Sequence, residues 1–313
     1  MAGFRVVVTD QVFPDVDVER ELIGAAGGTV EVPAGDRQRV LAAAADADAL
    51  LCTYFPLSAA DIALLKNCRI IARYGIGVDN VDLDAARAAG IAVTNVPDYC
   101  VTEVATHTAA MVLAMVRKIP AGDALVRAGG WGAARLGEVR RFSTLTVGLL
   151  GYGRIARDVA AILRPLAGAV IVHDPFVAEA EGGDRLVDLP TLLAESDVLC
   201  VHCPLTPRTR GIVDAAALAR MRPGAILVNT SRGPIVVLDD VVRALRDGTL
   251  GGAALDVFEH EPPDGAALAG VPRLLTTPHS AFYSREAIQE SQRKATTQVL
   301  KALRGEPLDY RVA

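Results

Sequence analysis

The sequence is poor in aromatic residues and in lysine. Only 4% of its 313 residues are aromatic, Trp131 is its single tryptophan, and four lysines stand beside 28 arginines. Because 37 acidic residues outnumber 32 basic ones, the net charge is −5, and no basic excess exists to displace counterions from nucleic-acid phosphates. We therefore expect no nucleic-acid partner.

The sequence also contains no apolar run long enough to span a bilayer. Its most apolar helical stretch, 104–116, includes His107 and is shorter than the roughly 20 residues that a membrane span needs. The first ten residues lack the charged-then-apolar plan of a signal peptide, and the five cysteines are an odd number. We expect no membrane partner and reduced thiols in a cytoplasmic protein.

What the sequence does contain is a regular alternation of short β-rich runs and Ala-rich helical stretches. This alternation is typical of parallel sheets covered by helices, and the length suits two domains. Strands are predicted at 5–8, 29–32, 49–51, 70–72 and 91–94, and in a second series at 147–150, 170–173, 198–202, 226–229, 253–256 and 274–276. The predicted fold class is α/β, with two doubly wound, Rossmann-like domains.

The segments outside the two series predict how the domains are joined. A helix is expected over 101–117, followed by an irregular Gly-rich stretch over 128–137 that contains Trp131. Ser284 is expected to cap a last helix that ends before Gly305. Because this helix lies outside the second series, we expect it to pack back on the first domain, which is then discontinuous in sequence.

A dinucleotide-binding fingerprint stands at the start of the second series. Gly151 permits a tight turn, Gly153 lets the backbone approach a pyrophosphate, and Ala156 is small enough for close helix–strand packing. Asp174 follows the next strand, where a carboxylate can bind the adenosine ribose hydroxyls. Since no arginine stands beside this acid to hold a 2′-phosphate, the sequence predicts NAD rather than NADP as the cofactor.

Three ionisable groups follow later strands of the same predicted sheet. Arg232, the acids Glu259 and Glu261, and His279 each come just past a strand, and the carboxyl ends of parallel strands share one edge. An imidazolium can protonate a developing alkoxide, a carboxylate keeps that imidazole charged, and an arginine neutralises a substrate carboxylate. This set predicts reversible hydride transfer at a carbonyl, and the spacing leaves open which of the two acids is the partner of His279.

Six ordered motifs resemble those of the D-isomer-specific 2-hydroxyacid dehydrogenases. They lie at 73–80, 151–155, 202–206, 228–233, 254–262 and 277–279, so the resemblance covers nearly the whole chain. It implies an enzyme that interconverts a D-2-hydroxy acid and its 2-oxo acid with NAD. It also implies a substrate domain of residues 1–98 and 285–313, an NAD-binding domain of residues 99–284, and a homodimer formed through an arm at about 118–145.

The resemblance also implies a catalytic set. By motif position it assigns substrate binding to Arg232, the carboxylate partner to Glu261 and the acid/base to His279. The choice of Glu261 over Glu259 thus comes from the resemblance. The related formate-oxidising branch carries Gln where this chain has Glu261, which favours a hydroxy acid over formate.

Within the family, the motifs at 73–80 and 278–284 are most similar to the C-terminal-binding-protein branch, which contains bacterial enzymes and animal corepressors. There the position of Arg73 holds the substrate carboxylate together with the backbone near Gly77, and Phe282 stands where the corepressors have Trp. Tyr54 is a further expected wall of the substrate pocket. The expected cofactor contacts are Thr102, Gly151, Gly153, Arg154, Ile155, Asp174, Cys203, Pro204, Thr209, Thr230 and Asp256.

Two alternatives accompany this prediction. The first is an NAD(H)-sensing scaffold of the corepressor type, which would need partner-docking extensions. Only about ten residues follow the last predicted helix, so the enzyme is favoured. The second is a metal site at Cys200 and Cys203, whose spacing suits metal-binding thiols, but the sequence offers no second pair to complete four ligands. We therefore expect no metal.

Overall fold

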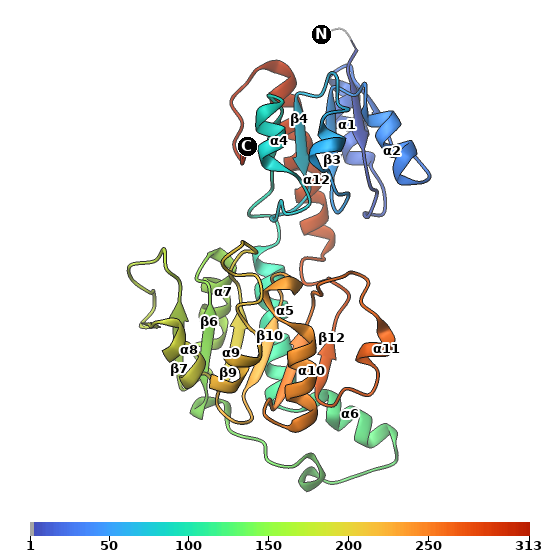
Figure 1. Cartoon of the computed structure of the whole chain (residues 1–313). Coiled ribbons are helices and arrows are strands. Elements are labelled where there is room, and N and C mark those ends of the chain that lie inside the picture. The colour runs from blue at the N-terminus through green and yellow to red at the C-terminus, as the bar shows by residue number, and fades with distance from the viewer. Residues whose placement is uncertain (1–2) are drawn as a thin grey trace. The chain divides into compact units, whose positions relative to one another are not determined.

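The structure of this chain is a computed structural model that describes residues 3–313, and it divides into two compact units (Figure 1). One unit contains the residues up to Tyr99 together with Tyr283–Ala313, and the other contains Cys100–Phe282. Each unit has a parallel sheet with helices on both of its faces. The predicted α/β class with two Rossmann-like sheets is confirmed.

The first unit contains a sheet of five parallel strands in the order β2-β1-β3-β4-β5. The strands are β1 (Arg5–Val8), β2 (Thr29–Glu31), β3 (Ala49–Cys52), β4 (Ile70–Arg73) and β5 (Ala92–Thr94), and the helices are α1 (Asp17–Ala25), α2 (Arg37–Ala44), α3 (Ala59–Ile62), α4 (Leu83–Ala88) and α12 (Arg285–Arg304). Strands β3 and β4 are buried along their whole length because helices cover both faces. The carboxyl ends of these central strands therefore open on one edge of the sheet.

The last helix, α12, brings the end of the chain back to the first sheet. The Ser284 hydroxyl accepts a hydrogen bond from the Ala287 amide and caps the helix, and Gly305 ends it in the left-handed conformation, as predicted. The helix packs against α1 and against strands β3 and β4.

The second unit contains a sheet of seven parallel strands in the order β12-β11-β10-β9-β6-β7-β8. The strands are β6 (Thr146–Leu150), β7 (Ala169–His173), β8 (Arg185–Leu186), β9 (Val198–Val201), β10 (Ile226–Asn229), β11 (Gly252–Leu255) and β12 (Leu274–Thr276). The sequence predicts six of these strands but not β8. This edge strand has two exposed residues, so it lacks the apolar run that marks the others.

Helices cover both faces of the second sheet. They are α5 (Val101–Val116), α6 (Ile119–Arg127), α7 (Arg154–Leu163), α8 (Leu189–Glu195), α9 (Ala215–Arg220), α10 (Leu238–Asp247) and α11 (Gly265–Leu268). One core joins α5 and α7 to the sheet, and another joins α8, α9 and α10 to it. The strand order reverses between β6 and β9, and doubly wound sheets bind their ligands at the carboxyl edge beside such a reversal.

The segment between α5 and β6 extends away from the sheet before it returns to β6 (Figure 1). Part of it is the helix α6, which sequence analysis did not predict although Pro120 stands in its first turn. Short 3-10 helices follow at Ala133–Leu136 and Phe142–Thr144. Trp131, in this segment, is 82% exposed.

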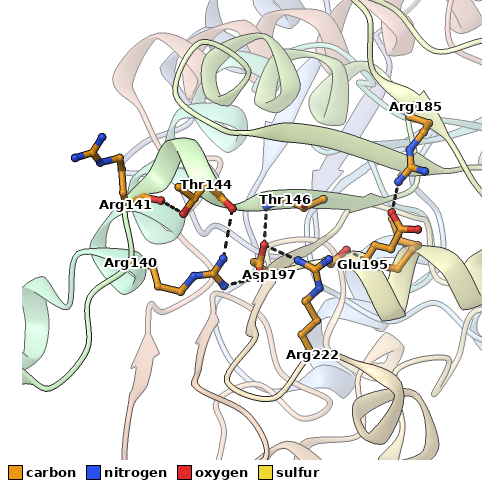
Figure 2. Close-up of polar contacts among 10 residues, drawn as sticks. Arg140, Arg141, Thr144, Thr146, Arg185, Glu195, Asp197 and Arg222 are labelled. Atoms are coloured by element: carbon orange, nitrogen blue, oxygen red, sulfur yellow. Dashed lines mark hydrogen bonds and ion pairs between the residues drawn. The ribbon is translucent and has the colours of Figure 1, made fainter.

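A buried aspartate holds the returning end of this segment on the sheet. Asp197 accepts hydrogen bonds from the Thr146 amide (2.8 Å), from Arg140 (2.6 Å) and from Arg222 (2.9 Å), as Figure 2 shows. Burial raises the pKa of the Asp197 carboxyl, but these three donors outweigh burial and hold the pKa below its usual value. Arg140 is thereby fixed at the amino edge of the sheet, opposite the edge that carries the candidate site.

None of the helices between residues 3 and 313 combines the length and apolarity needed to cross a bilayer.

Candidate active site

The glycine turn between β6 and α7 has the geometry of a dinucleotide-binding loop. Gly151 has a φ of +95°, and a Cβ at this position would lie 2.6 Å from the Cys203 nitrogen, so a larger residue would clash with backbone. A Cβ at Gly153 would meet no atom within 4 Å, and Arg154 begins α7 immediately afterwards. The helix N-terminus is therefore open to an anion, as a bound pyrophosphate requires.

Asp174 lies beside this turn. Its carboxylate accepts hydrogen bonds from the Tyr152 amide (2.8 Å) and from the Phe176 amide (2.9 Å), which join the end of β7 to the glycine loop. Tyr152 itself is buried and donates to Asp184 (2.8 Å), so the loop after Asp174 is anchored as well. The half-buried carboxylate of Asp174 thus has a fixed place next to the turn, which fits recognition of ribose hydroxyls.

The other expected cofactor contacts fall into two groups by exposure. Thr102, Arg154 and Pro204 are exposed, whereas Ile155 and Thr209 are half-buried. The Thr209 hydroxyl donates to the Pro204 carbonyl (2.6 Å) and closes the loop that follows β9.

Two further members of that set are buried. The backbone of Cys203 packs against Gly151, and burial raises the pKa of its thiol to about 11. Thr230 is 8% exposed, and its hydroxyl is paired with that of Thr108 (2.8 Å) on α5. These residues shape the loops around the glycine turn.

Arg232 follows β10 in a loop fixed by the buried Asn229. The Asn229 amide donates to the Arg232 carbonyl (2.9 Å), and its oxygen accepts from the Ser231 amide (3.0 Å). A Cβ at Gly233 would lie 1.9 Å from the carbonyl carbon of Phe258, so the loops that follow β10 and β11 touch through their backbones. Glycine is required at this contact.

Glu261 is hydrogen-bonded to His279. Its Oε2 lies 2.7 Å from the His279 Nδ1, and its Oε1 accepts from the Phe258 amide (2.9 Å). Burial raises the pKa of the Glu261 carboxyl, but the bonds from His279 and Phe258 and the charges of His279 and Arg232 outweigh it, so the pKa is lowered. Of the two acids, it is therefore Glu261 whose carboxylate lies on His279.

His279 has a φ of +52°, a strained conformation for a residue with a side chain. Asp256 holds it there: the Asp256 carbonyl accepts from the His279 amide (2.8 Å), and the carboxylate accepts from the amides of Ser280 and Ala281 (both 2.9 Å) and from the Thr277 hydroxyl. The Asp256 carboxylate is 1% exposed and is occupied by donors of its own loop, so Asp256 positions His279. Its contact with the cofactor stays a prediction.

Thr277 and His107 also belong to this arrangement, which the sequence pattern did not predict. The Thr277 hydroxyl donates to the Asp256 carboxylate, so it accepts from the His107 Nε2 (3.1 Å) on α5. The ring of Phe282 stands edge-on to that of His279, with 6.0 Å between the centroids. Only the fold reveals the contact of His107 with the loop after β12.

The remaining candidates belong to the first unit, at the carboxyl ends of β3 and β4. Arg73 ends β4, is 7% exposed, and donates from Nε to the Thr53 carbonyl (3.2 Å). Tyr54 is 40% exposed, and Gly77 is half-buried in the loop after β4.

Comparison with known proteins identifies the second unit. Residues 109–281 match the family described as "D-isomer specific 2-hydroxyacid dehydrogenase, NAD binding domain". The chain is 36% identical to D-3-phosphoglycerate dehydrogenase of Mycobacterium bovis over 96% of its own length and 57% of that protein, and 37% identical to glycerate dehydrogenase of Methylorubrum extorquens over 75% and 76%. It thus spans less than two thirds of the length of the mycobacterial relative.

A solved structure adds a ligand-bound relative. D-lactate dehydrogenase from Aquifex aeolicus, complexed with NAD and lactic acid, superposes with a TM-score of 0.88 at 25% identity over 96% of each chain. The relatives named here are dehydrogenases by name, and they give the corepressor-type scaffold no support. The resemblance to the C-terminal-binding-protein branch stays a prediction.

Proposed function

Because this chain belongs to the family of D-isomer-specific 2-hydroxyacid dehydrogenases, we propose that it interconverts a D-2-hydroxy acid and its 2-oxo acid with NAD as the cofactor. The observation that carries this proposal is the contact between Glu261 and His279, with the charge of Arg232 acting on the same carboxylate. This set lies past the ends of β10, β11 and β12, on the sheet edge that also carries the glycine turn.

The residues around the glycine turn fit the cofactor. The open N-terminus of α7 at Gly153 and Arg154 would hold the pyrophosphate, and Asp174 would accept the ribose hydroxyls. When bound, NAD accepts the hydride of the hydroxy acid and NADH returns it to the oxo acid.

His279 performs the proton transfer in this proposal. Its Nδ1 is held by Glu261, so the proton exchanged with the substrate is that on Nε2. In reduction, His279 gives this proton to the oxygen of the carbonyl group, and in oxidation it takes the hydroxyl proton. Glu261 stabilises the imidazolium, because its own lowered pKa keeps it negatively charged at neutral pH.

Arg232 neutralises the substrate carboxylate in this proposal. A guanidinium can bind a carboxylate through two parallel hydrogen bonds, which orients the adjacent carbonyl as well as binding the anion. Asn229 and Gly233 fix the loop that carries Arg232, so its side chain starts from a constrained backbone.

The proposed function is tested by NADH oxidation with a panel of 2-oxo acids graded by side-chain size. We expect at least one member to be reduced, with saturation in both oxo acid and NADH. If NADH binds and every member of the panel is inert, the protein is a nucleotide-binding scaffold and not this enzyme.

Cofactor choice rests on Asp174. Asp174→Ala should weaken NADH binding on the order of tenfold, because the ribose hydroxyls lose a charged acceptor, and should affect NADPH less. Titration of both cofactors into parent and variant measures this. Asp158→Ala, which removes an exposed acid of α7, is the control for the change in charge. Equal affinities of the parent protein for NADH and NADPH would contradict the prediction that NAD is the preferred cofactor.

The role of Glu261 predicts a change in the pH profile. In Glu261→Gln the protonated form of His279 loses an adjacent negative charge, so the imidazolium is held less well. Reduction needs the protonated form, so its rate should begin to fall at a lower pH than in the parent. Glu259→Gln should leave the profile unchanged, because the carboxylate that lies on the His279 Nδ1 is that of Glu261. The pH dependence of kcat/KM checks this, and identical profiles for Glu261→Gln and parent would remove Glu261 from the mechanism.

The arm suggests a homodimer. Trp131 is 82% exposed, and burying so large an apolar surface against a second copy would be favourable. Light scattering at micromolar concentration should give twice the chain mass of 32.8 kDa. Trp131→Ala should weaken this dimer, whereas Leu166→Ala, a smaller exposed apolar residue on the same unit, should not. A measured mass equal to that of one chain would contradict the predicted dimer.

All five cysteines are free and buried. Burial raises the pKa of Cys52, Cys68 and Cys200 to about 12, so these thiols stay protonated and unreactive. This chemistry suits the reducing cytoplasm, which is where the proposed enzyme would work.

A further inference from the structure

One carboxylate in the first unit collects three consecutive backbone amides. Asp10 follows β1, and its Oδ1 accepts from the Thr53 amide (2.9 Å) while its Oδ2 accepts from those of Tyr54 (2.5 Å) and Phe55 (3.1 Å). The Thr9 hydroxyl adds a fourth bond to Oδ1 (2.8 Å). Each carboxylate oxygen therefore has two donors.

This arrangement fixes the loop after β3 from its amide side. Successive N–H groups that converge on one point form a concave site for an anion, and here the anion is a side chain of the same unit. Such bonds to a charged acceptor are stronger than bonds between neutral groups. Asp10 thus determines the path of the loop that carries Tyr54, although it lies more than 40 residues earlier in the sequence.

The carbonyl side of the same loop is held by two other residues. The Asn80 amide donates to the carbonyls of Thr53 (3.3 Å) and Phe55 (2.9 Å), and Arg73 donates to the Thr53 carbonyl (3.2 Å). A Cβ at Gly75 would lie 1.7 Å from the Arg73 Nη1, so the guanidinium lies in space that only glycine leaves open. The placement of Arg73 therefore depends on where the Thr53 carbonyl stands.

We infer that Asp10 is a positioning residue for substrate binding, acting through the loop 53–55 on Tyr54 and Arg73. The inference rests on the proposed function and on the prediction from the sequence that these two side chains contact the 2-oxo acid. Asp10 acts only through the loop. It fixes the loop backbone so that Tyr54 forms a wall of the substrate pocket and Arg73 presents its charge to the substrate.

Asp10→Asn is the test variant, because it keeps the size of the side chain and removes the charge. With one of its two oxygens replaced by an NH₂ group, at least one amide of the loop loses its acceptor. We expect KM for the best 2-oxo acid to rise on the order of tenfold, with kcat within about twofold of the parent and NADH affinity unchanged. Asn80→Ala, which frees the loop carbonyls, should shift KM in the same direction.

Asp82→Ala is the control. Asp82 accepts the Ala85 amide (2.9 Å) and caps α4 in the same unit, so alanine, which offers no acceptor, should lower thermal stability without moving KM. A KM increase confined to Asp10→Asn and Asn80→Ala separates positioning from a general loss of stability.

Amide hydrogen exchange of residues 53–55 provides a readout that needs no activity. The parent should protect these amides, and Asp10→Asn should exchange them faster while leaving β3 protected. Unchanged exchange, or a parental KM in Asp10→Asn, overturns the inference. A parent protein that reduces no 2-oxo acid overturns the proposed function instead, and the exchange data then decide by themselves whether Asp10 holds the loop.

Discussion

Replacing His279 by alanine is expected to lower kcat for 2-oxo acid reduction by about 100-fold or more, in line with typical contributions of general acid–base catalysis. The variant removes the proton donor, and it leaves the glycine turn and Asp174 intact. NADH affinity should therefore stay within about twofold of the parent. Steady-state kinetics together with NADH titration measure both quantities.

His260→Ala is the control for this experiment. His260 is exposed in the loop that follows β11, two residues beyond the buried Phe258, so its loss should leave kcat unchanged. If His279→Ala keeps nearly full activity, the proton donor lies elsewhere in the chain. A joint loss of activity and NADH binding would instead indicate a collapsed loop, which Asp256 normally holds.

Arg232→Ala is expected to damage both kcat and KM, lowering kcat/KM on the order of 100-fold. The arginine binds the substrate carboxylate and orients the carbonyl beside it, so its loss affects ground-state binding and the reacting geometry together. Compared with Arg232→Ala, Arg232→Lys should bring KM part of the way back to the parent value but restore little of kcat. Lysine restores the positive charge but not the pair of parallel hydrogen-bond donors. Kinetics of both variants on the best substrate separate charge from geometry.

Arg73→Ala should raise KM and leave kcat near the parent value. We expect Arg73 to bind the substrate carboxylate, as the resemblance to the family implies. A parental KM for Arg73→Ala would make Arg73 a structural residue that supports the Thr53 carbonyl.

Much of the fold could be predicted because local signals and tertiary structure agree. Buried parallel strands are short apolar runs, and Ser284 and Gly305 mark the ends of α12 by their capping chemistry. The two elements that were missed have weak local signals. Strand β8 is two exposed residues paired with β7, and α6 has no buried residue.

The site could be predicted where the chemistry follows a strand directly. Gly151, Asp174 and His279 all stand just past strand ends, which parallel topology gathers on one edge. The hydrogen bonds that hold His279 in place could not be predicted, because they join Asp256 to backbone amides about two dozen residues away. Spacing alone could not choose between Glu259 and Glu261. The resemblance chose Glu261, and the structure places its carboxylate on His279.

The central claim, a dehydrogenase specific for the D isomer of a 2-hydroxy acid, is tested most directly by oxidising the two enantiomers of one acid separately. The acid is the reduced form of the best 2-oxo substrate, and NADH formation is followed at saturating NAD. We predict that the D enantiomer reduces NAD in a reaction lost in His279→Ala, while the L enantiomer yields no NADH above background. Equal rates with both enantiomers, or turnover of the L form alone, would contradict the account.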